Sequence, residues 1–172
     1  MWNYPGSPDP KIWAKKKDLD ILYKWENDAS LWGEGSAIAP YSKYHLQSFV
    51  ETAGDIFSLR QMRLMIVSNH DHQTVGCIDL IDFEPRFARA EVAVLVDSPY
   101  QNKGYATEAL QLMKNYAFRF LCLHQLYAYV SEYNNVSLRL FMSAGFFKIA
   151  LLKEWYRDED WKNCWLLQYI NE

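Results

Sequence analysis

The segment Val92–Thr107, VAVLVDSPYQNKGYAT, constrains the fold of this chain more than any other stretch. Its first part, Val92–Val96, is an uninterrupted apolar run rich in β-branched residues, which is the pattern of a strand buried on both faces. Asp97–Pro99 end that run, and a helical pattern begins after Ala106. The segment therefore predicts a strand, a tight polar loop and the N-terminus of a helix.

The polar loop between this strand and helix has the composition of an anion-binding site. The first backbone N–H groups of a helix have no partner within the helix, and the helix dipole makes the potential there positive. Gly104 lets the backbone approach a bulky anion, small Ala106 keeps the start of the helix open, and Lys103 adds a positive charge. We therefore expect a phosphate or pyrophosphate group to bind at this loop.

The spacing of the loop residues narrows the class of site. The pattern Gln101-x-x-Gly104-x-Ala106 is neither the GxxxxGK[ST] loop of nucleotide triphosphatases nor the GxGxxG loop of dinucleotide-binding domains. It resembles the Q/R-x-x-G-x-G/A loop of the GCN5-related N-acetyltransferases (GNAT), which holds the pyrophosphate of acetyl-CoA. The resemblance implies a cofactor site for acetyl-CoA in this chain.

A second segment strengthens the resemblance. Residues 134–146 are similar to the family signature N-x-x-[AS]-x-x-x-[YF]-x-x-x-G-F, with Asn134, Ser137 and Phe141 at the matching positions. Asn134 caps the expected helix, and in the family it points at the cofactor. Glu154-Trp155 and the early WENDAS (25–30) resemble the branch that contains spermidine N-acetyltransferases and ribosomal-protein N-acetyltransferases.

The rest of the chain predicts one domain, 1–172, with elements in the order of the GNAT fold. Residues 1–11 form a Pro-rich lead-in that we expect to be loosely ordered. Apolar periodicity predicts helices over 19–27, 42–52, 107–121 and 134–144, with Asp18 and Ser42 as N-caps and Gly54 and Gly145 at helix ends. Strands are predicted over 12–16, 63–67, 74–83, 89–96, 125–130, 146–153 and 163–170.

These elements predict a mixed α/β (α+β) fold. The strand 125–130 must lie parallel to 89–96 through a right-handed crossover, because a helix separates them. The resemblance implies a central, mostly antiparallel sheet with helices on both faces, in which this one parallel pair splays apart to hold acetyl-CoA. It also implies the cofactor-contacting residues, which are Val94, Leu95, Val96, Gln101, Asn102, Lys103, Gly104, Tyr105, Ala106, Thr107, Asn134 and Phe141.

The resemblance also indicates catalytic residues. Glu91 matches a glutamate often found on this strand, and we predict it to be the general base through a water molecule; the alternatives are a surface carboxylate on a strand or a partner for Arg86 or Arg89. Many relatives carry a tyrosine acid where this chain has Phe141, which cannot donate a proton. Ser137, Tyr133 and Tyr156 are the candidates to replace that acid.

The acceptor pocket is expected between residues 25–50 and the last hairpin. There Trp25, Trp32, Glu34, Tyr41 and Tyr44, with Tyr156, offer ring faces and a carboxylate to a cation, although the same aromatics also suit a core or an interface. The candidate substrate-binding residues are Trp25, Trp32, Glu34 and Tyr156. His70-Asp71-His72 lacks a third ligand at metal-site spacing, so no metal is predicted.

Charge and cysteine content bound the function classes. The net charge of −3 gives no electrostatic case for nucleic acid, and no apolar run reaches the roughly 20 residues of a membrane helix. The 3 cysteines lack CxxC spacing, which indicates reduced thiols and a cytoplasmic location. No signal peptide heads the chain, and the aromatic content suits a homodimer.

Three functions fit these observations. The first is an acetyl-CoA-dependent N-acetyltransferase that acts by direct attack of a primary amine in a ternary complex, with a polyamine-like molecule, a protein N-terminus or an aminoglycoside-type amine as acceptor. The second is a non-catalytic acyl-CoA-binding module, which Phe141 keeps open. The third is a nucleotide-binding α/β domain outside the GNAT family.

Overall fold

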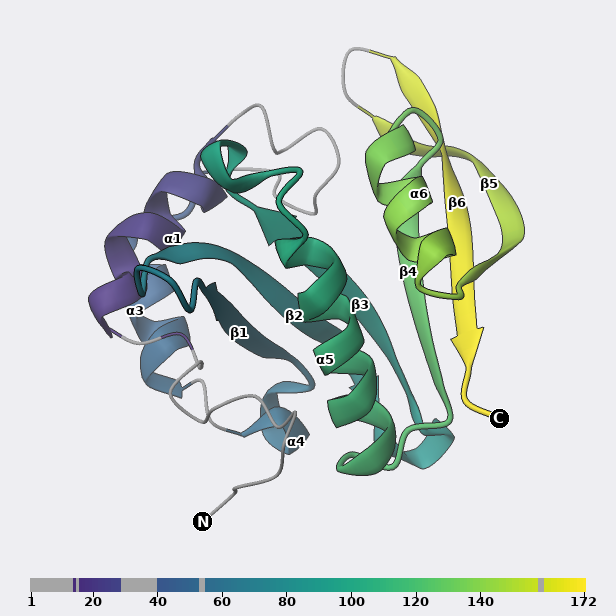
Figure 1. Cartoon of the computed structure of the whole chain (residues 1–172), viewed down its shortest axis with the longest axis horizontal. Coiled ribbons are helices and arrows are strands. Elements are labelled where there is room, and N and C mark those ends of the chain that lie inside the picture. The colour runs from purple at the N-terminus through teal and green to yellow at the C-terminus, as the bar shows by residue number, and fades with distance from the viewer. Residues whose placement is uncertain (1–13, 15, 29–39, 53–54, 158–159) are drawn as a thin grey trace.

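The computed structural model describes residues 14, 16–28, 40–52, 55–157 and 160–172 (Figure 1). Its helices are η2 (Lys16–Asp18), α1 (Leu19–Glu26), α3 (Lys43–Thr52), α4 (Ile56–Leu59), η3 (Pro85–Phe87), η4 (Ser98–Tyr100), α5 (Tyr105–Arg119) and α6 (Asn135–Ser143). Its strands are β1 (Met62–Val67), β2 (Thr74–Glu84), β3 (Arg89–Val96), β4 (Gln125–Ser131), β5 (Phe147–Arg157) and β6 (Trp161–Ile170). The predicted mixed α/β fold is confirmed.

One six-stranded sheet with the order β1-β2-β3-β4-β6-β5 runs through the molecule. All neighbouring strands are antiparallel except β3 and β4, which are parallel and joined through α5. This is the predicted βαβ unit in its predicted place. The final strand β6 inserts between β4 and β5, so β5 is an edge strand.

Helices cover both faces of the sheet. Side chains of α5 and α6 share one core cluster with alternate residues of the sheet, among them Leu80, Val92 and Leu126. Side chains of α1 and α3 form a second cluster with Met65 and Cys77, which point to the opposite face because successive strand residues alternate. Figure 1 shows α5 in front of the part of the sheet with β2 and β3 and α6 in front of β4 and β6, with α1 and α3 grouped beside β1.

Most predicted elements are confirmed, and the corrections lie at their ends. Ser42 caps α3 as predicted, since its Oγ accepts a hydrogen bond of 3.2 Å from His45 N–H. Asp18 is the N-cap residue of α1, as predicted, but its side chain makes no capping hydrogen bond, because the residue is already in helical backbone conformation. The short helix α4, capped by Asp55, was not predicted.

Some predictions fall on residues outside the described part of the chain. These are the lead-in 1–11, the helix end at Gly54 and most of the strand 12–16, of which Lys16 belongs to η2 instead. The last hairpin is longer than predicted, since β5 extends to Arg157 and β6 starts at Trp161. Among the described residues, no helix combines the length and apolarity that a membrane crossing requires.

Gly76 of β2 allows β2 and β3 to approach closely. A Cβ atom at this position would lie 2.2 Å from the backbone oxygen of Leu95, a distance that real side chains do not tolerate. We predict that Gly76→Ala lowers the free energy of unfolding by about 2 kcal/mol or more, because the backbone of β3 must move. Urea unfolding measures this change. An unchanged denaturation midpoint would show that the two strands separate at no cost.

Candidate active site

The parallel strands β3 and β4 pair only at their beginnings. Their register covers Arg89, Ala90 and Glu91 against Gln125–Tyr127 and stops there. Beyond that point β3 stays paired with β2 as far as Val96, whereas β4 stays paired with β6 as far as Ser131. The two strands therefore diverge, and backbone groups of β3 after Glu91 that face β4 are left for another partner.

This divergence corrects one sequence-based expectation. The run Val92–Val96 was expected to be buried on both faces, but only Val92 is buried, and the four residues after it are half-buried. The physical reason is that β4 turns away just where the run begins, so its neighbour on that side is missing. The apolar composition of the run is that of a strand lining a gap.

The loop after β3 presents backbone N–H groups at the mouth of this gap. Gln101 fixes the loop to the strand end, because its Nε2 donates a hydrogen bond of 3.0 Å to the Val96 oxygen. Asn102 and Gly104 have positive φ values of 59° and 88°, a pattern of alternating backbone handedness that turns N–H groups toward one point. The first hydrogen bond of α5 comes from Glu108 N–H to the Gly104 oxygen, so Tyr105, Ala106 and Thr107 N–H groups precede the helical ladder.

The helix α6 begins on the other side of the gap, after β4. Asn134 caps it, as expected, through a hydrogen bond of 2.9 Å from Ser137 N–H to its Oδ1. Ser137 is half-buried one turn into the helix. Phe141 is 3% exposed and packs edge-on against Phe146 in the core, with ring centroids 5.1 Å apart.

Glu91 lies at the last paired position of β3, where the gap opens. Burial raises the pKa of its carboxyl group to about 7, and the charges of Asp82 and Asp79 add to the shift. A carboxyl group with a pKa near neutrality can accept and release protons under physiological conditions, as a general base must. The described ion pairs do not join Glu91 to Arg86 or Arg89, which were its alternative partners.

Two tyrosines that the sequence analysis did not select lie on the same face as Glu91. Tyr127 pairs with Glu91 in register, and Tyr129 follows two residues later on the same side of β4. Burial raises the pKa of both phenols, with a smaller contribution from the Glu91 charge, so both stay protonated and can donate hydrogen bonds. The parallel alignment of the two strands was the signal that could have found them.

The last hairpin folds over these tyrosines. A bulge in β5 beside Glu154, which has a φ of 51°, accompanies the stacking of Trp155 on Tyr129 at 5.9 Å between ring centroids. Tyr156, a predicted substrate residue, is half-buried, and its hydroxyl oxygen accepts a hydrogen bond of 3.5 Å from the Cys164 thiol. The hairpin therefore brings two aromatic side chains to the face of the sheet that carries Glu91.

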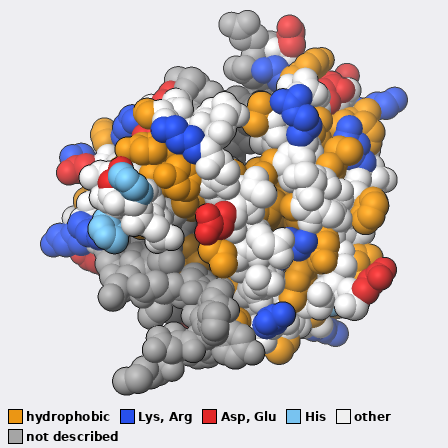
Figure 2. Space-filling view, viewed as in Figure 1, with side chains coloured by type: hydrophobic (Ala, Val, Ile, Leu, Met, Phe, Trp, Pro, Cys, Tyr) orange, Lys and Arg blue, Asp and Glu red, His pale blue; other side chains and the backbone are white. Residues whose placement is uncertain are grey.

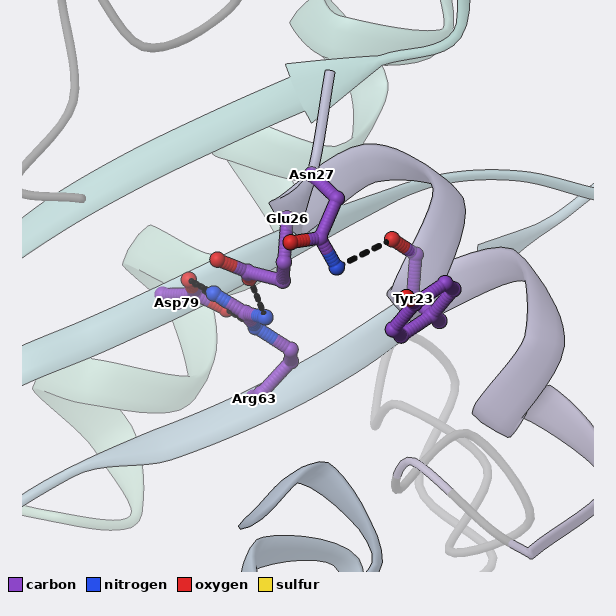
Figure 3. A network of polar contacts seen from close by, with 5 residues as sticks. All are labelled: Tyr23, Glu26, Asn27, Arg63 and Asp79. Carbon is purple, nitrogen blue, oxygen red and sulfur yellow. Dashed lines mark hydrogen bonds and ion pairs between the residues drawn. The ribbon is translucent and has the colours of Figure 1, made fainter. Parts of the chain in front are cut away.

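A cavity of about 330 Å³ opens on the same side, between α3 and the strands β1 and β2. Arg63 is central to it and binds both Asp79, at 2.7 Å, and Glu26 (Figure 3). Burial alone would lower the pKa of Arg63, but the carboxylates of Asp79 and Glu26 keep it charged. The lining of this cavity also includes Tyr41, His45 and Phe49.

The remaining predicted site residues do not all meet at the gap. Trp25 is 3% exposed and packs into the core between α1 and the sheet, so we leave it out of the acceptor site. Tyr133 is 67% exposed on the turn before α6. Lys103 lies at the rim of the loop, with Nζ 5.4 Å from the ring centroid of Tyr100. Trp32 and Glu34 lie outside the described residues.

The described residues contain no group of three or more His, Cys, Asp or Glu side chains that could hold a metal ion. All three cysteines, Cys77, Cys122 and Cys164, are free thiols. Burial raises the pKa of the Cys77 and Cys164 thiols, which makes them poor nucleophiles at neutral pH.

Comparison with known proteins identifies the family. Residues 13–147 match the family described as the acetyltransferase (GNAT) domain. The chain belongs to this family. The spermidine N(1)-acetyltransferase of Escherichia coli K12 is 27% identical to this GNAT domain over 157 residues, which cover 87% of this chain and 79% of that protein. The interpretation as a nucleotide-binding domain outside the family is thereby wrong.

Solved structures share the fold of this GNAT domain. The spermidine N-acetyltransferase from Vibrio cholerae in complex with CoA and spermine superposes with a TM-score of 0.82 at 19% identity, covering 92% of each chain. A dodecameric structure of the Vibrio cholerae enzyme in an intermediate state gives a TM-score of 0.79 at 19% identity, covering 92% of this chain and 91% of that one. At these identities the likeness shows the fold.

The raised pKa of Glu91 predicts a pH-dependent cost to stability. The folded protein keeps a proton on Glu91 up to about pH 7, whereas an unfolded glutamate loses it near pH 4.3, so the folded state binds more protons in between. The free energy of unfolding of the wild type should therefore fall, relative to that of Glu91→Gln, as the pH rises from 5 to 7.5. Urea unfolding of both proteins at these pH values measures the difference. An equal gap at both pH values would contradict the raised pKa.

Proposed function

We propose that this chain transfers the acetyl group of acetyl-CoA to a primary amine of a polyamine-like small molecule, within a ternary complex. The observation that carries the proposal is the divergence of β3 and β4 beside a loop of free N–H groups at the start of α5. The relatives named above act on spermidine, which supports a polyamine-like acceptor over a protein N-terminus.

The residues present fit acetyl-CoA. The pyrophosphate would bind the N–H groups from Asn102 to Thr107, where the backbone of Asn102 and Gly104 has the required handedness. A Cβ at Gly104 would meet nothing within 4 Å, so there is open space beside this loop. The amide-bearing arm of the cofactor would lie in the gap beside Val94, Leu95 and Val96, like a strand added to β3. Asn134 and Ser137 would face it from the start of α6.

The acceptor would lie on the opposite face of the sheet, beside Glu91. Carboxylates gather there, since the charges of Asp79 and Asp82 both act on Glu91. Trp155 and Tyr156 add ring faces from the hairpin, and a cation is attracted to such faces. A molecule with more than one amine could place a second ammonium group in the cavity beside Glu26 and Asp79, where the two carboxylates share one arginine.

The chemistry asks little of this chain beyond positioning and one proton transfer. Acetyl-CoA supplies the activated thioester when it is bound. Glu91 accepts the proton of the acceptor ammonium through water, because an alkyl amine must be neutral to attack. Backbone N–H groups of β3 near Leu95 donate to the oxygen that gains charge. Ser137, Tyr133 and Tyr156 are the candidates to donate a proton to the leaving thiolate, because the family tyrosine is replaced by Phe141.

A second candidate function is binding without turnover. Phe141 favours it, because this side chain has no proton to donate and is buried against Phe146. Such a module would use the same cofactor loop and act as a sensor or structural partner. The two functions differ only in turnover.

We also propose that the protein is cytoplasmic. The support is the set of three free thiols, which suits a reducing compartment.

Turnover with a panel of amines tests the proposal. Purified protein is mixed with acetyl-CoA and spermidine, spermine, an aminoglycoside or a peptide with a free N-terminus, and thiol release is followed. We expect release with the polyamines, a rate that rises with pH through about 7 as Glu91 loses its proton, and a loss of roughly 100-fold or more in Glu91→Gln. The matched control is Glu84→Gln, which removes a carboxylate of β2 that pairs with Arg60 away from the gap.

The outcomes separate the candidates. Release that survives in Glu91→Gln keeps the enzyme and removes Glu91 as its base. Acetyl-CoA binding by calorimetry without release from any amine favours the binding module. Absence of both binding and release contradicts the proposed cofactor site. Ser137→Ala, Tyr133→Phe and Tyr156→Phe then show which hydroxyl, if any, assists the leaving thiolate.

We further propose that the protein self-associates through the edge strand β5. Its outer edge has no partner strand among the residues that the structure describes, and it carries exposed Phe147 and Ile149, at 72% and 55%. A relative forms a dodecamer, which supports assembly in this family. Figure 2 shows that hydrophobic side chains on the face with α5 and α6 lie scattered among charged ones, so that face offers no better alternative.

Light scattering after size exclusion tests this assembly. We expect the wild type to elute as a dimer or larger and Phe147→Glu as a monomer, because a charge would be buried in the interface. The control is Phe57→Glu, which changes an equally exposed phenylalanine (68%) on α4. A monomeric wild type, or loss of assembly in both variants, would contradict a role for β5.

A further inference from the structure

Lys114 of α5 is a buried lysine whose contacts are unusual. It is 8% exposed, and the described ion pairs give it no carboxylate. Its Nζ donates a hydrogen bond of 2.6 Å to the backbone oxygen of Ala144 and lies 3.7 Å from the ring centroid of Tyr169. Burial lowers its pKa, so removing this charge from water has a cost that the contacts must offset.

The acceptor of this hydrogen bond is the end of α6. Gly145 has a φ of 91°, and the N–H groups of Gly145 and Phe146 bond the oxygens of Met142 and Phe141. That arrangement satisfies carbonyl groups within the last turn, and Lys114 supplies a donor to the Ala144 carbonyl that follows. The positive charge also complements the negative end of the helix dipole.

The position of this contact connects the two helices that border the proposed cofactor site. Lys114 follows Gly104 by ten residues along α5, or about 15 Å, and Ala144 follows Asn134 by the same number along α6. The contact therefore joins the second half of α5 to the end of α6, away from the loop and the Asn134 cap. It limits how far the two helices can move apart.

Tyr169 and Gly145 complete the joint. The ring of Tyr169 lies between Phe118 of α5 and Phe146 after α6, at 5.4 and 5.6 Å between centroids. A Cβ at Gly145 would approach this ring to 3.1 Å and Lys114 Nζ to 4.0 Å, so the glycine leaves room for the lysine and tyrosine to pack.

We propose that Lys114 is a positioning residue, which sets the separation of α5 and α6 through Ala144 and so the width of the acetyl-CoA site. The inference rests on the proposed function, because it needs the cofactor to bind between the starts of these helices. Lys114 itself touches neither the loop nor Glu91 among the contacts described above.

The test compares Lys114→Met with Lys148→Met. Methionine keeps the apolar length of lysine and removes the donor and the charge. Lys148 of β5 is a matched control, since it also places its Nζ over a ring, 4.3 Å from the centroid of Trp165, but does not bond the end of α6. Lys114→Leu is the second variant if the methionine protein does not fold.

We expect Lys114→Met to weaken acetyl-CoA binding in calorimetry about tenfold. The KM for acetyl-CoA should rise by the same factor, and kcat should change less than twofold. Its melting temperature should stay level or rise, because a buried charge is gone. In the free protein, hydrogen exchange at Gly145 and Phe146 N–H should speed up. Lys148→Met should bind as the wild type does.

Three results would overturn the inference. They are wild-type binding in Lys114→Met, an equal loss in Lys148→Met, and a loss of binding that only follows a lower melting temperature. A wild type that does not bind acetyl-CoA would instead remove the proposed function, and this inference with it.

Discussion

The short seam between β3 and β4 is the constraint on which the rest of this structure depends. Each strand has a partner on its other side, β2 for β3 and β6 for β4, and each keeps that partner beyond the seam, β3 as far as Val96 and β4 as far as Ser131. The sheet is thus two well-paired halves joined over three residue pairs at Arg89–Glu91. The backbone groups of β3 and β4 that face each other beyond this seam take no part in the ladders of the two halves, so they remain available to another partner.

The helices then determine what the two sides of the gap can do. Lys24 of α1 pairs with Asp97 at 2.9 Å, which connects the helices of the acceptor face to the end of β3 and its loop. On the other face, α5 and α6 each start where a diverging strand ends. A cofactor entering from the side of these helix N-termini and an amine arriving from the side of Glu91 would therefore meet in the gap without sharing a route.

The sequence predicted the parts of this arrangement that depend on local pattern. The βαβ unit, the loop and the Asn134 cap follow from short-range periodicity and capping chemistry, which act within a few residues. The half-buried state of Ala93–Val96 did not, because it depends on where β4 goes. The pKa of Glu91 likewise depends on Asp79 and Asp82 across the neighbouring strand, and Lys114 meets Ala144 only through the packing of two helices.

The family tyrosine is replaced by Phe141, and this loss of a proton donor affects only the step in which the thiolate leaves. A thiolate leaving group has a pKa near 8.5, so at neutral pH it needs little help to take a proton from water. The harder proton transfer is at the acceptor amine, whose pKa is near 10, and the proposed mechanism assigns it to Glu91, which has a pKa of about 7 and lies where the gap begins. Phe141, at 3% exposure, instead packs from α6 into the core against Phe146. The proposed acetyl transfer at neutral pH would therefore depend on the base more than on the missing acid.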